Sequence, residues 1–127
     1  MKPIKPLLIL IVDDEVVVRE TLTSMFEHFG HTAQWVGDGI AGKEALMKTP
    51  YDAAFVDMRM PGLDGIHLLE WAVEAQEVDL PIIIMTGHGA KDAHDEAIAS
   101  GAFAFLNKPF RLKEIKQIIE RIQQRRQ

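Results

Sequence analysis

Apolar residues gather in five short runs along the chain, separated by longer stretches of mixed polarity. The runs lie at Leu7–Val12, Thr32–Val36, Ala53–Val56, Ile82–Met85 and Ala102–Leu106. Several of them are apolar at consecutive positions, which is typical of strands in a parallel sheet with both faces covered. We therefore predict five strands, of which the second and the fifth carry the weaker pattern.

The stretches between the runs carry helical spacing. The clearest example places apolar side chains on one helix face at Val18, Leu22, Met25, Phe26 and Phe29. The same pattern returns near the end of the chain at Leu112, Ile115, Ile119 and Ile122. Weaker patterns predict helices at about Gly39–Lys48, Asp64–Ala75 and Lys91–Ser100. Gly30 and Gly101 are suited to end helices, and Asp64 is suited to cap one.

Strand and helix thus alternate five times. This order predicts an α/β fold with a parallel sheet and helices on both faces. Right-handed crossovers leave few ways to wind such a chain. The commonest five-stranded solution is the doubly wound, flavodoxin-like (βα)5 fold with strand order 2-1-3-4-5, whose ligands lie at the carboxyl ends of strands 1 and 3. A length of 127 residues is that of one domain.

The composition of the chain excludes several classes of site and of partner. The chain has no cysteine, which excludes disulfides, thiol nucleophiles and cysteine-ligated zinc. It has 14 Lys and Arg against 19 Asp and Glu, a net charge of −5, and is poorly suited to bind nucleic acid by itself. The apolar run Leu7–Val12 is far shorter than the ~20 residues of a membrane span, and no signal peptide is recognisable. We therefore expect a cytoplasmic protein.

Polar or charged side chains follow four of the five predicted strands, at Asp13, Asp14, Asp57, Thr86 and Lys108. In a doubly wound sheet these side chains converge on one crevice. Taken singly, each has an ordinary explanation, such as a helix cap for Asp14, a turn hydroxyl for Thr86 and a solvated loop lysine for Lys108. Their shared position at one edge of the predicted sheet favours a functional site.

Electrostatics points to the chemistry of such a site. Two carboxylates ~4 Å apart repel by ~4 kcal/mol at an effective dielectric constant of ~20. Three of them in one crevice therefore need positive charge, of which Lys108 supplies one unit. Mg²⁺ is suited to supply the remaining positive charge, because it prefers hard oxygen ligands and takes one or two carboxylates together with phosphate oxygens. A metal, a carboxylate nucleophile, a hydroxyl and an ammonium together favour phosphoryl transfer.

These residues and their neighbours resemble the receiver (CheY-like) domain of response regulators in two-component signalling. The matching motifs are ILIVDDE at 9–15, VDMRMPGLDG at 56–65, MTGHG at 85–89 and KPF at 108–110. The resemblance covers about residues 7–124, so we expect residues 1–127 to form one receiver domain. The basic C-terminal end, with Arg121, Arg125 and Arg126, has two interpretations: a solvated last helical turn that is favourable for the helix dipole, which is the ordinary one, and a linker to an effector domain. The sequence around Thr86 and Pro109 is similar to receivers of the nitrogen-regulation and nitrogen-fixation types.

The resemblance implies a role for each matching residue. Asp57 is the expected phosphoacceptor, which takes a phosphoryl group from the phosphohistidine of a sensor histidine kinase. Mg²⁺ is the expected cofactor, with ligands from Asp13, Asp14, Asp57 and the backbone carbonyl of Arg59, and Asp13 acts mainly through a bound water. Lys108 is expected to pair with the phosphoryl oxygens, and the Lys108–Pro109 peptide bond is expected to be cis.

Thr86 and Phe105 are the expected switch of such a domain. Thr86 donates its hydroxyl to the phosphoryl group and moves toward it, and Phe105 turns into the space that Thr86 leaves. Physical chemistry is consistent with this, because a phosphoryl group needs donors and a packed interior tolerates few voids. Plain core burial is the alternative for Phe105, which also lacks the hydroxyl of the tyrosine that is frequent at this position in the family.

The resemblance also implies partners. These are a sensor histidine kinase, an effector domain or downstream target protein, and a second copy of the chain in a phosphorylation-dependent homodimer. No direct contact with nucleic acid or with a membrane is expected. No enzymatic activity is expected beyond Mg²⁺-dependent self-phosphorylation and autodephosphorylation.

Three other functions are compatible with parts of the sequence. A Mg²⁺-dependent phosphohydrolase would use an aspartyl nucleophile, but it usually has a second acid two residues later, where this chain has Arg59. A flavin-binding protein of this topology needs a phosphate-cradling loop after the first strand, where Asp13 and Asp14 lie instead. A receiver that has lost phosphorylation would only bind partners, yet the chain retains all five site residues.

Arg59 and His88 lie two residues beyond Asp57 and Thr86, respectively. In the resemblance, these positions lie at the mouth of the site and tune hydrolysis of the aspartyl phosphate. Both side chains are long or bulky, so we expect them to crowd the attacking water. Simple exposure to solvent is the alternative.

Overall fold

The computed structural model describes residues 5–60, 62–75, 78–87 and 91–125. Strands and helices alternate along these residues. The strands are β1 (Leu8–Val12), β2 (Thr32–Val36), β3 (Ala53–Asp57), β4 (Ile82–Thr86) and β5 (Ala104–Asn107). The helices are α1 (Val16–His28), α2 (Gly39–Lys48), α3 (Gly65–Glu74), α4 (Lys91–Ala99) and α5 (Leu112–Arg125).

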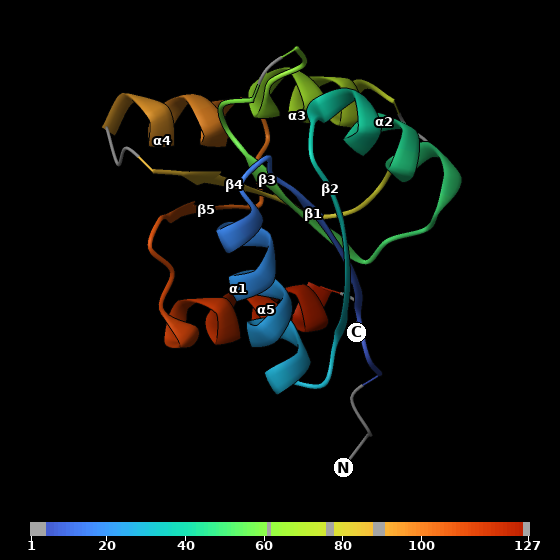
Figure 1. Ribbon diagram of the computed structural model, residues 1–127. Helices are drawn as coiled ribbons and strands as arrows, with labels where there is room; N and C mark the ends of the chain where they lie inside the picture. The colour runs from blue at the N-terminus through green and yellow to red at the C-terminus, as the bar shows by residue number, and fades with distance from the viewer. Residues whose placement is uncertain (1–4, 61, 76–77, 88–90, 126–127) are drawn as a thin grey trace.

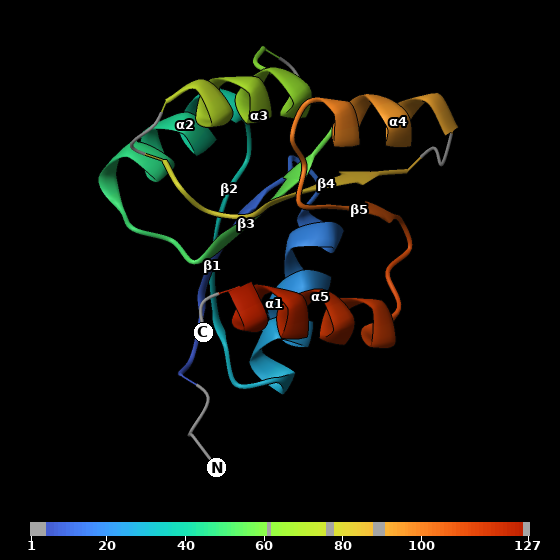
Figure 2. The ribbon, with the colours of Figure 1, turned by 180° about the vertical axis from the view of Figure 1, so that it is seen from behind.

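The strands form one parallel sheet in the order β2-β1-β3-β4-β5. Helices α1 and α5 cover one face of the sheet, and α2, α3 and α4 cover the other (Figures 1 and 2). The predicted doubly wound fold with strand order 2-1-3-4-5 is therefore confirmed.

The sheet separates two apolar cores, because successive side chains of a strand point to opposite faces. On the α1 and α5 side, Phe26 of α1 meets Phe55 of β3 edge to face, with ring centroids 4.9 Å apart. On the other side, Leu68 and Leu69 of α3 pack against alternate positions of the central strands. Every residue of β3 and β4 is buried, as the uninterrupted apolar runs predict.

The weaker pattern of the second run reflects its place in the sheet. β2 is an edge strand, and three of its five residues are exposed. Its Trp35 is more than half exposed and lies under the guanidinium of Arg19, 3.7 Å from the ring centroid. An edge strand needs an apolar pattern only where a helix covers it, and α1 covers β2 only in part.

The predicted helix ends are confirmed at Gly30 and Gly101, which have φ angles of 86° and 105°. Asp64 caps α3 as predicted, accepting a hydrogen bond from the His67 N–H at 2.9 Å. The fifth strand begins later than predicted, at Ala104. The cause is the end of α4, where the Ala102 N–H still donates to the Ala97 carbonyl at 3.0 Å. None of the helices in the described ranges combines the length and the apolar character that crossing a membrane requires.

Candidate functional site

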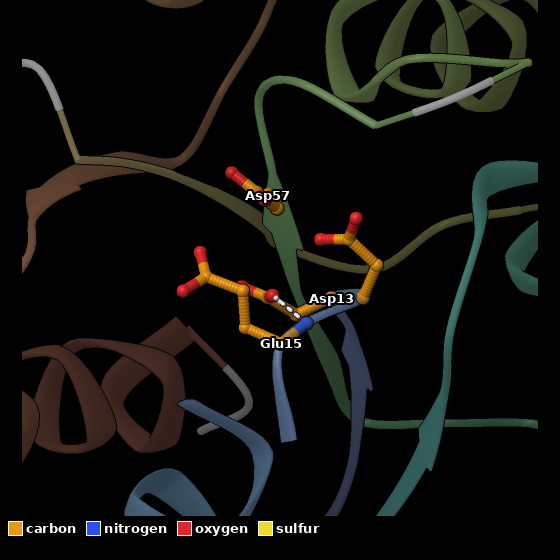
Figure 3. A group of neighbouring side chains, drawn as sticks. Asp13, Glu15 and Asp57 are labelled. Atoms are coloured by element: carbon orange, nitrogen blue, oxygen red, sulfur yellow. Dashed lines mark hydrogen bonds between the residues drawn. The ribbon is translucent and has the colours of Figure 1, made fainter. Parts of the chain in front are cut away.

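The carboxyl ends of β1 and β3 bring the acidic residues together. The two strands are neighbours, with Val12 paired to Val56, so Asp13 and Asp57 emerge side by side. Carboxylate oxygens of four residues lie within 4.8 Å of one another, namely Asp13, Asp14, Glu15 and Asp57. Figure 3 shows three of these side chains turned toward the same space above the sheet edge.

Asp13 is the fully buried member of the acidic cluster. Its Oδ1 accepts a hydrogen bond from the Glu15 N–H at 2.8 Å. Its Oδ2 forms an ion pair with Lys108 at 2.9 Å but, within the described part of the chain, accepts no well-directed hydrogen bond. This oxygen therefore has room for a further donor, such as a metal-bound water.

Asp14 is exposed and does not cap α1. The residue at the cap position is Glu15, and its side chain makes no capping hydrogen bond. The ordinary explanation of Asp14 as a helix cap therefore does not hold, whereas its carboxylate does join the acidic cluster.

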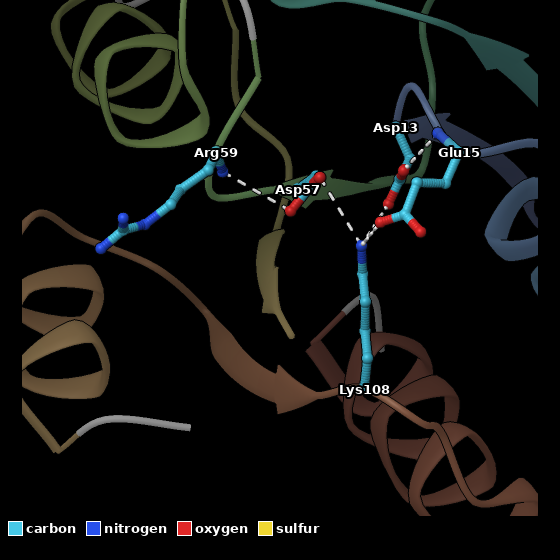
Figure 4. A network of polar contacts seen from close by, with 5 residues as sticks. All are labelled: Asp13, Glu15, Asp57, Arg59 and Lys108. Carbon is cyan, nitrogen blue, oxygen red and sulfur yellow. Dashed lines mark hydrogen bonds and ion pairs between the residues drawn. The ribbon is translucent and has the colours of Figure 1, made fainter. Parts of the chain in front are cut away.

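Lys108 lies at the centre of the charges, as Figure 4 shows. Its Nζ is 2.9 Å from Asp13, 3.2 Å from Glu15 and 3.5 Å from Asp57. Burial alone would lower the pKa of Lys108, but the Asp13 carboxylate beside its ammonium, together with the Asp57 and Glu15 carboxylates, outweighs burial and raises it. The backbone N–H of Lys108 donates to the Thr86 carbonyl at 2.8 Å, so β4 fixes the backbone position from which the Lys108 side chain extends.

Asp57 is the last residue of β3 and is only 6% exposed. Burial and the neighbouring Asp13 carboxylate raise the pKa of Asp57 to about 6, and the Lys108 ammonium opposes this shift. The carboxyl group is therefore mostly ionised at neutral pH, as a nucleophile must be. An added cation beside it would favour the ionised form further.

The cluster fits a magnesium ion. Among the residues that the structure describes, it offers four carboxylates with hard oxygen atoms and one ammonium, that of Lys108, to balance their charge. Such oxygen-rich sites with an open side are those that Mg²⁺ occupies in proteins.

Arg59 approaches the cluster through its backbone. Its N–H lies 3.5 Å from Asp57 Oδ1, a long contact, while its side chain extends away from Asp57 (Figure 4). Arg59 also lines a depression between α3 and α4, together with Asp64, Asp92 and Glu96. This is not a position in which Arg59 crowds a water molecule at Asp57. His88, its predicted counterpart, lies outside the described residues, as does Pro61.

Thr86 and Phe105 lie on adjacent strands and face the same side of the sheet. Phe105 pairs with Ile84, and Thr86 pairs with Asn107. Because side chains alternate along a strand, Ile84, Thr86 and Phe105 all point toward α3 and α4. Thr86 is buried, and Phe105 is half-buried against the core on that side. The Lys108–Pro109 peptide bond is cis, which confirms that expectation.

Two residues of the site were not among the sequence-based predictions. Glu15 adds a fourth carboxylate to the cluster and a third ion pair to Lys108, and its direct succession to Asp13 and Asp14 was the available signal. Gly65 opens α3 so close to β3 that an added Cβ would lie 2.3 Å from the Asp57 carbonyl oxygen. Only glycine permits this approach, and before the fold was known the glycine itself was the one signal of it.

Comparison with protein families gives one match that covers most of the chain. The family described as response regulator receiver domain matches residues 9–120. The transcriptional regulatory protein FixJ of Bradyrhizobium diazoefficiens is 38% identical over 112 residues, which are 88% of this chain and 54% of FixJ. The chain thus spans about half the length of that regulator.

Two further relatives match over nearly their whole length. Sporulation initiation phosphotransferase F of Bacillus subtilis is 31% identical over 113 residues, covering 89% of this chain and 90% of that protein. The receiver domain of sensor histidine kinase PA1611 from Pseudomonas aeruginosa superposes with a TM-score of 0.84 at 29% identity, covering 94% of this chain and 98% of that one. That crystal structure has a magnesium ion coordinated in its active-site cleft.

Proposed function

Because the chain belongs to the response regulator receiver domain family, we propose that it accepts a phosphoryl group on Asp57 with Mg²⁺ as cofactor. The observation that carries this proposal is the position of Asp57. It is buried, ionisable near neutral pH, and flanked by an ammonium on one side and by further carboxylates on the other. Residues 1–127, with a core of about 7–124, form one receiver domain in this proposal.

The transfer is a nucleophilic displacement at phosphorus. An oxygen of the Asp57 carboxylate forms a bond to phosphorus as the bond from phosphorus to the nitrogen of a phosphohistidine breaks. The electron pair of the broken bond stays with the imidazole, which takes a proton. The Lys108 ammonium, 3.5 Å from Asp57, is placed to pair with the phosphoryl oxygens.

Mg²⁺ would be held by Asp13, Asp14, Asp57 and the backbone carbonyl of Arg59, with Asp13 acting mainly through water. When bound, the ion neutralises charge on the carboxylates and on the phosphoryl oxygens. The spacing of the carboxylates and the burial of Asp13 and Asp57 among them support this ligand set. Glu15 is a rim residue that shares Lys108 with Asp13.

Thr86 and Phe105 would carry the signal away from Asp57. A phosphoryl group adds three strong acceptors, and the Thr86 hydroxyl at the end of the adjacent strand is a suitable donor. A shift of Thr86 toward the site leaves space on the face that Phe105 also occupies, and a packed interior favours filling that space. The shared face of the two side chains supports this switch.

A sensor histidine kinase is the proposed phosphodonor. The proposed recipient of the signal is an effector domain, a downstream target protein, or a second copy of the chain in a phosphorylation-dependent homodimer. We propose no direct contact with nucleic acid or a membrane, and no catalysis beyond self-phosphorylation and autodephosphorylation.

Intact-mass spectrometry tests the proposal. The protein is incubated with Mg²⁺ and phosphoramidate, whose P–N bond imitates that of phosphohistidine. We expect a single phosphoryl adduct in the wild type and none in Asp57→Asn. Asp64→Asn is the matched control, because it makes the same chemical change seven residues away and asparagine also caps helices. An adduct of equal yield in Asp57→Asn would refute the assignment.

A further inference from the structure

Two aromatic rings join α4 to β5. The imidazole of His94 meets the ring of Phe105 edge to face, with centroids 5.2 Å apart and planes at 85°. This is the geometry in which aromatic rings attract each other beyond simple burial. The two residues come from different elements, and α4 lies beside β5 in both views of the fold (Figures 1 and 2).

The surroundings of Phe105 leave its ring room to turn. It borders a depression of about 380 Å³ that is also lined by His94, Ile98 and Arg121. The ring is only half-buried, so the core does not enclose it on every side. The contact with His94 is therefore a directional restraint on a ring that is otherwise free on its outer side.

The restraint on Phe105 depends on how closely α4 lies against the sheet, because His94 is part of that helix. Ala97 is fully buried, and this small side chain lets the helix approach the sheet closely. His94 lies one turn before Ala97, and its side chain is 54% exposed. Within the described residues its other polar contact is a long one, 3.4 Å from Nδ1 to the neighbouring Asp95. The ring contact with Phe105 thus joins this imidazole to a different element, whereas the contact with Asp95 lies within α4.

We propose that His94 is a positioning residue that holds Phe105 in its present orientation and so couples α4 to the phosphoryl site. The inference rests on the proposed function, because Thr86 and Phe105 face the same side of adjacent strands. Removing the imidazole releases Phe105 to turn inward. Losing an edge-to-face pair changes the population ratio of the inward and the present orientation of Phe105 by roughly two- to tenfold. Phosphorylation therefore becomes faster by up to that factor.

The experiment compares four proteins that carry 4-fluorophenylalanine. They are the wild type, His94→Ala, His94→Phe and His28→Ala. His94→Phe retains an aromatic edge for Phe105. His28→Ala is the matched control, because His28, the last residue of α1, makes the same kind of ring contact with the next residue, Phe29, at 5.0 Å and 75°. The Phe105 fluorine signal is identified by its loss in Phe105→Leu, and adduct formation with phosphoramidate is followed by mass.

We expect His94→Ala alone to move the Phe105 signal and to speed adduct formation two- to tenfold, with His94→Phe close to the wild type. An unmoved signal in His94→Ala overturns the proposal. An unchanged rate, or an equal change in His28→Ala, also overturns it, because the effect is then absent or not specific to this contact. If the wild type forms no adduct, the proposed function fails, whereas the fluorine spectra of the free proteins still decide whether His94 holds Phe105.

Discussion

The carboxylate of Glu15 lies 3.2 Å from the ammonium of Lys108, next to the carboxylate of Asp13 (Figure 4). Asp13 pairs with the same ammonium from the buried side at 2.9 Å. The Glu15 side chain is 62% exposed, so its carboxylate can move away from Lys108 into water at little cost. The Asp13 carboxylate is buried, so separating it from Lys108 would leave an unpaired charge in the protein interior. Lys108 is thus anchored by Asp13 and shared with Glu15.

We expect Mg²⁺ to raise the melting temperature, because a ligand that binds only the folded state stabilises it and relieves repulsion among the carboxylates. Asp14→Asn should remove most of this shift, and Glu15→Gln should reduce it modestly because Glu15 is at the rim. Thermal melts over a Mg²⁺ titration measure both. Glu20→Gln, an exposed charge change on α1, serves as control. Equal shifts in Asp14→Asn and the wild type would mean that the ion binds elsewhere.

Without Mg²⁺, Asp57 should make the fold less stable as pH rises. Its folded pKa is about 6, above the unfolded value of 3.8, so the folded state binds more protons between these values and loses stability as pH increases through them. Asp57→Asn should therefore be more stable than the wild type at pH 7, and this advantage should shrink by about 1 kcal/mol at pH 5. Urea unfolding in EDTA at both pH values measures it, beside Asp64→Asn. An advantage that is the same at both pH values would contradict the prediction.

His31 should act in the opposite direction at the far end of the sheet. This imidazole is buried, and its Nδ1 accepts a hydrogen bond from the Leu7 N–H at 3.0 Å. Burial lowers the pKa of His31, and the nearby Asp52 opposes the shift. The unfolded chain therefore takes up a proton first as pH falls below 6.5, so the folded state loses stability over that interval.

The test for His31 replaces it with an acceptor that does not titrate. In His31→Asn the amide oxygen takes the place of Nδ1, and we expect this variant to lose less stability than the wild type between pH 7 and pH 5. Urea unfolding at several pH values gives the two profiles. His67→Asn, at an exposed position on α3, is the control. Parallel profiles for the wild type and His31→Asn would exclude the proposed role.

Arg59→Ala should leave the lifetime of the phosphoryl group within about threefold of the wild type. The Arg59 side chain extends away from Asp57, and Arg59 also lines the depression between α3 and α4, so the side chain does not obstruct a water molecule that attacks the phosphoryl group. Decay of the adduct in excess Mg²⁺, after removal of the donor, measures the lifetime. A tenfold change would show that the arginine reaches the site once Asp57 is phosphorylated.

The alternation of apolar runs and helical spacing was sufficient to predict the fold, because the strand order of a doubly wound sheet leaves few alternatives. It also placed Asp13, Asp57 and Lys108 at one edge of the sheet. It could not give the sharing of Lys108 with Glu15, since that depends on side-chain rotamers. Nor could it give the contact between His94 and Phe105, which depends on how closely α4 approaches β5. The late start of β5 follows from a single hydrogen bond at the end of α4.

The parallel pairing of every strand has a consequence for how the protein is made. No two neighbouring strands are joined by a hairpin, and Ile83 pairs with Ala104 only after a helix has intervened. On the ribosome, Asp13 and Asp57 emerge well before Lys108, so the nascent acidic cluster has no ammonium to balance it. Repulsion between the two carboxylates then opposes the pairing of β1 and β3 until a positive charge is present. The last strand completes the sheet, and Lys108 directly behind it brings an ammonium that pairs with Asp13 and Asp57.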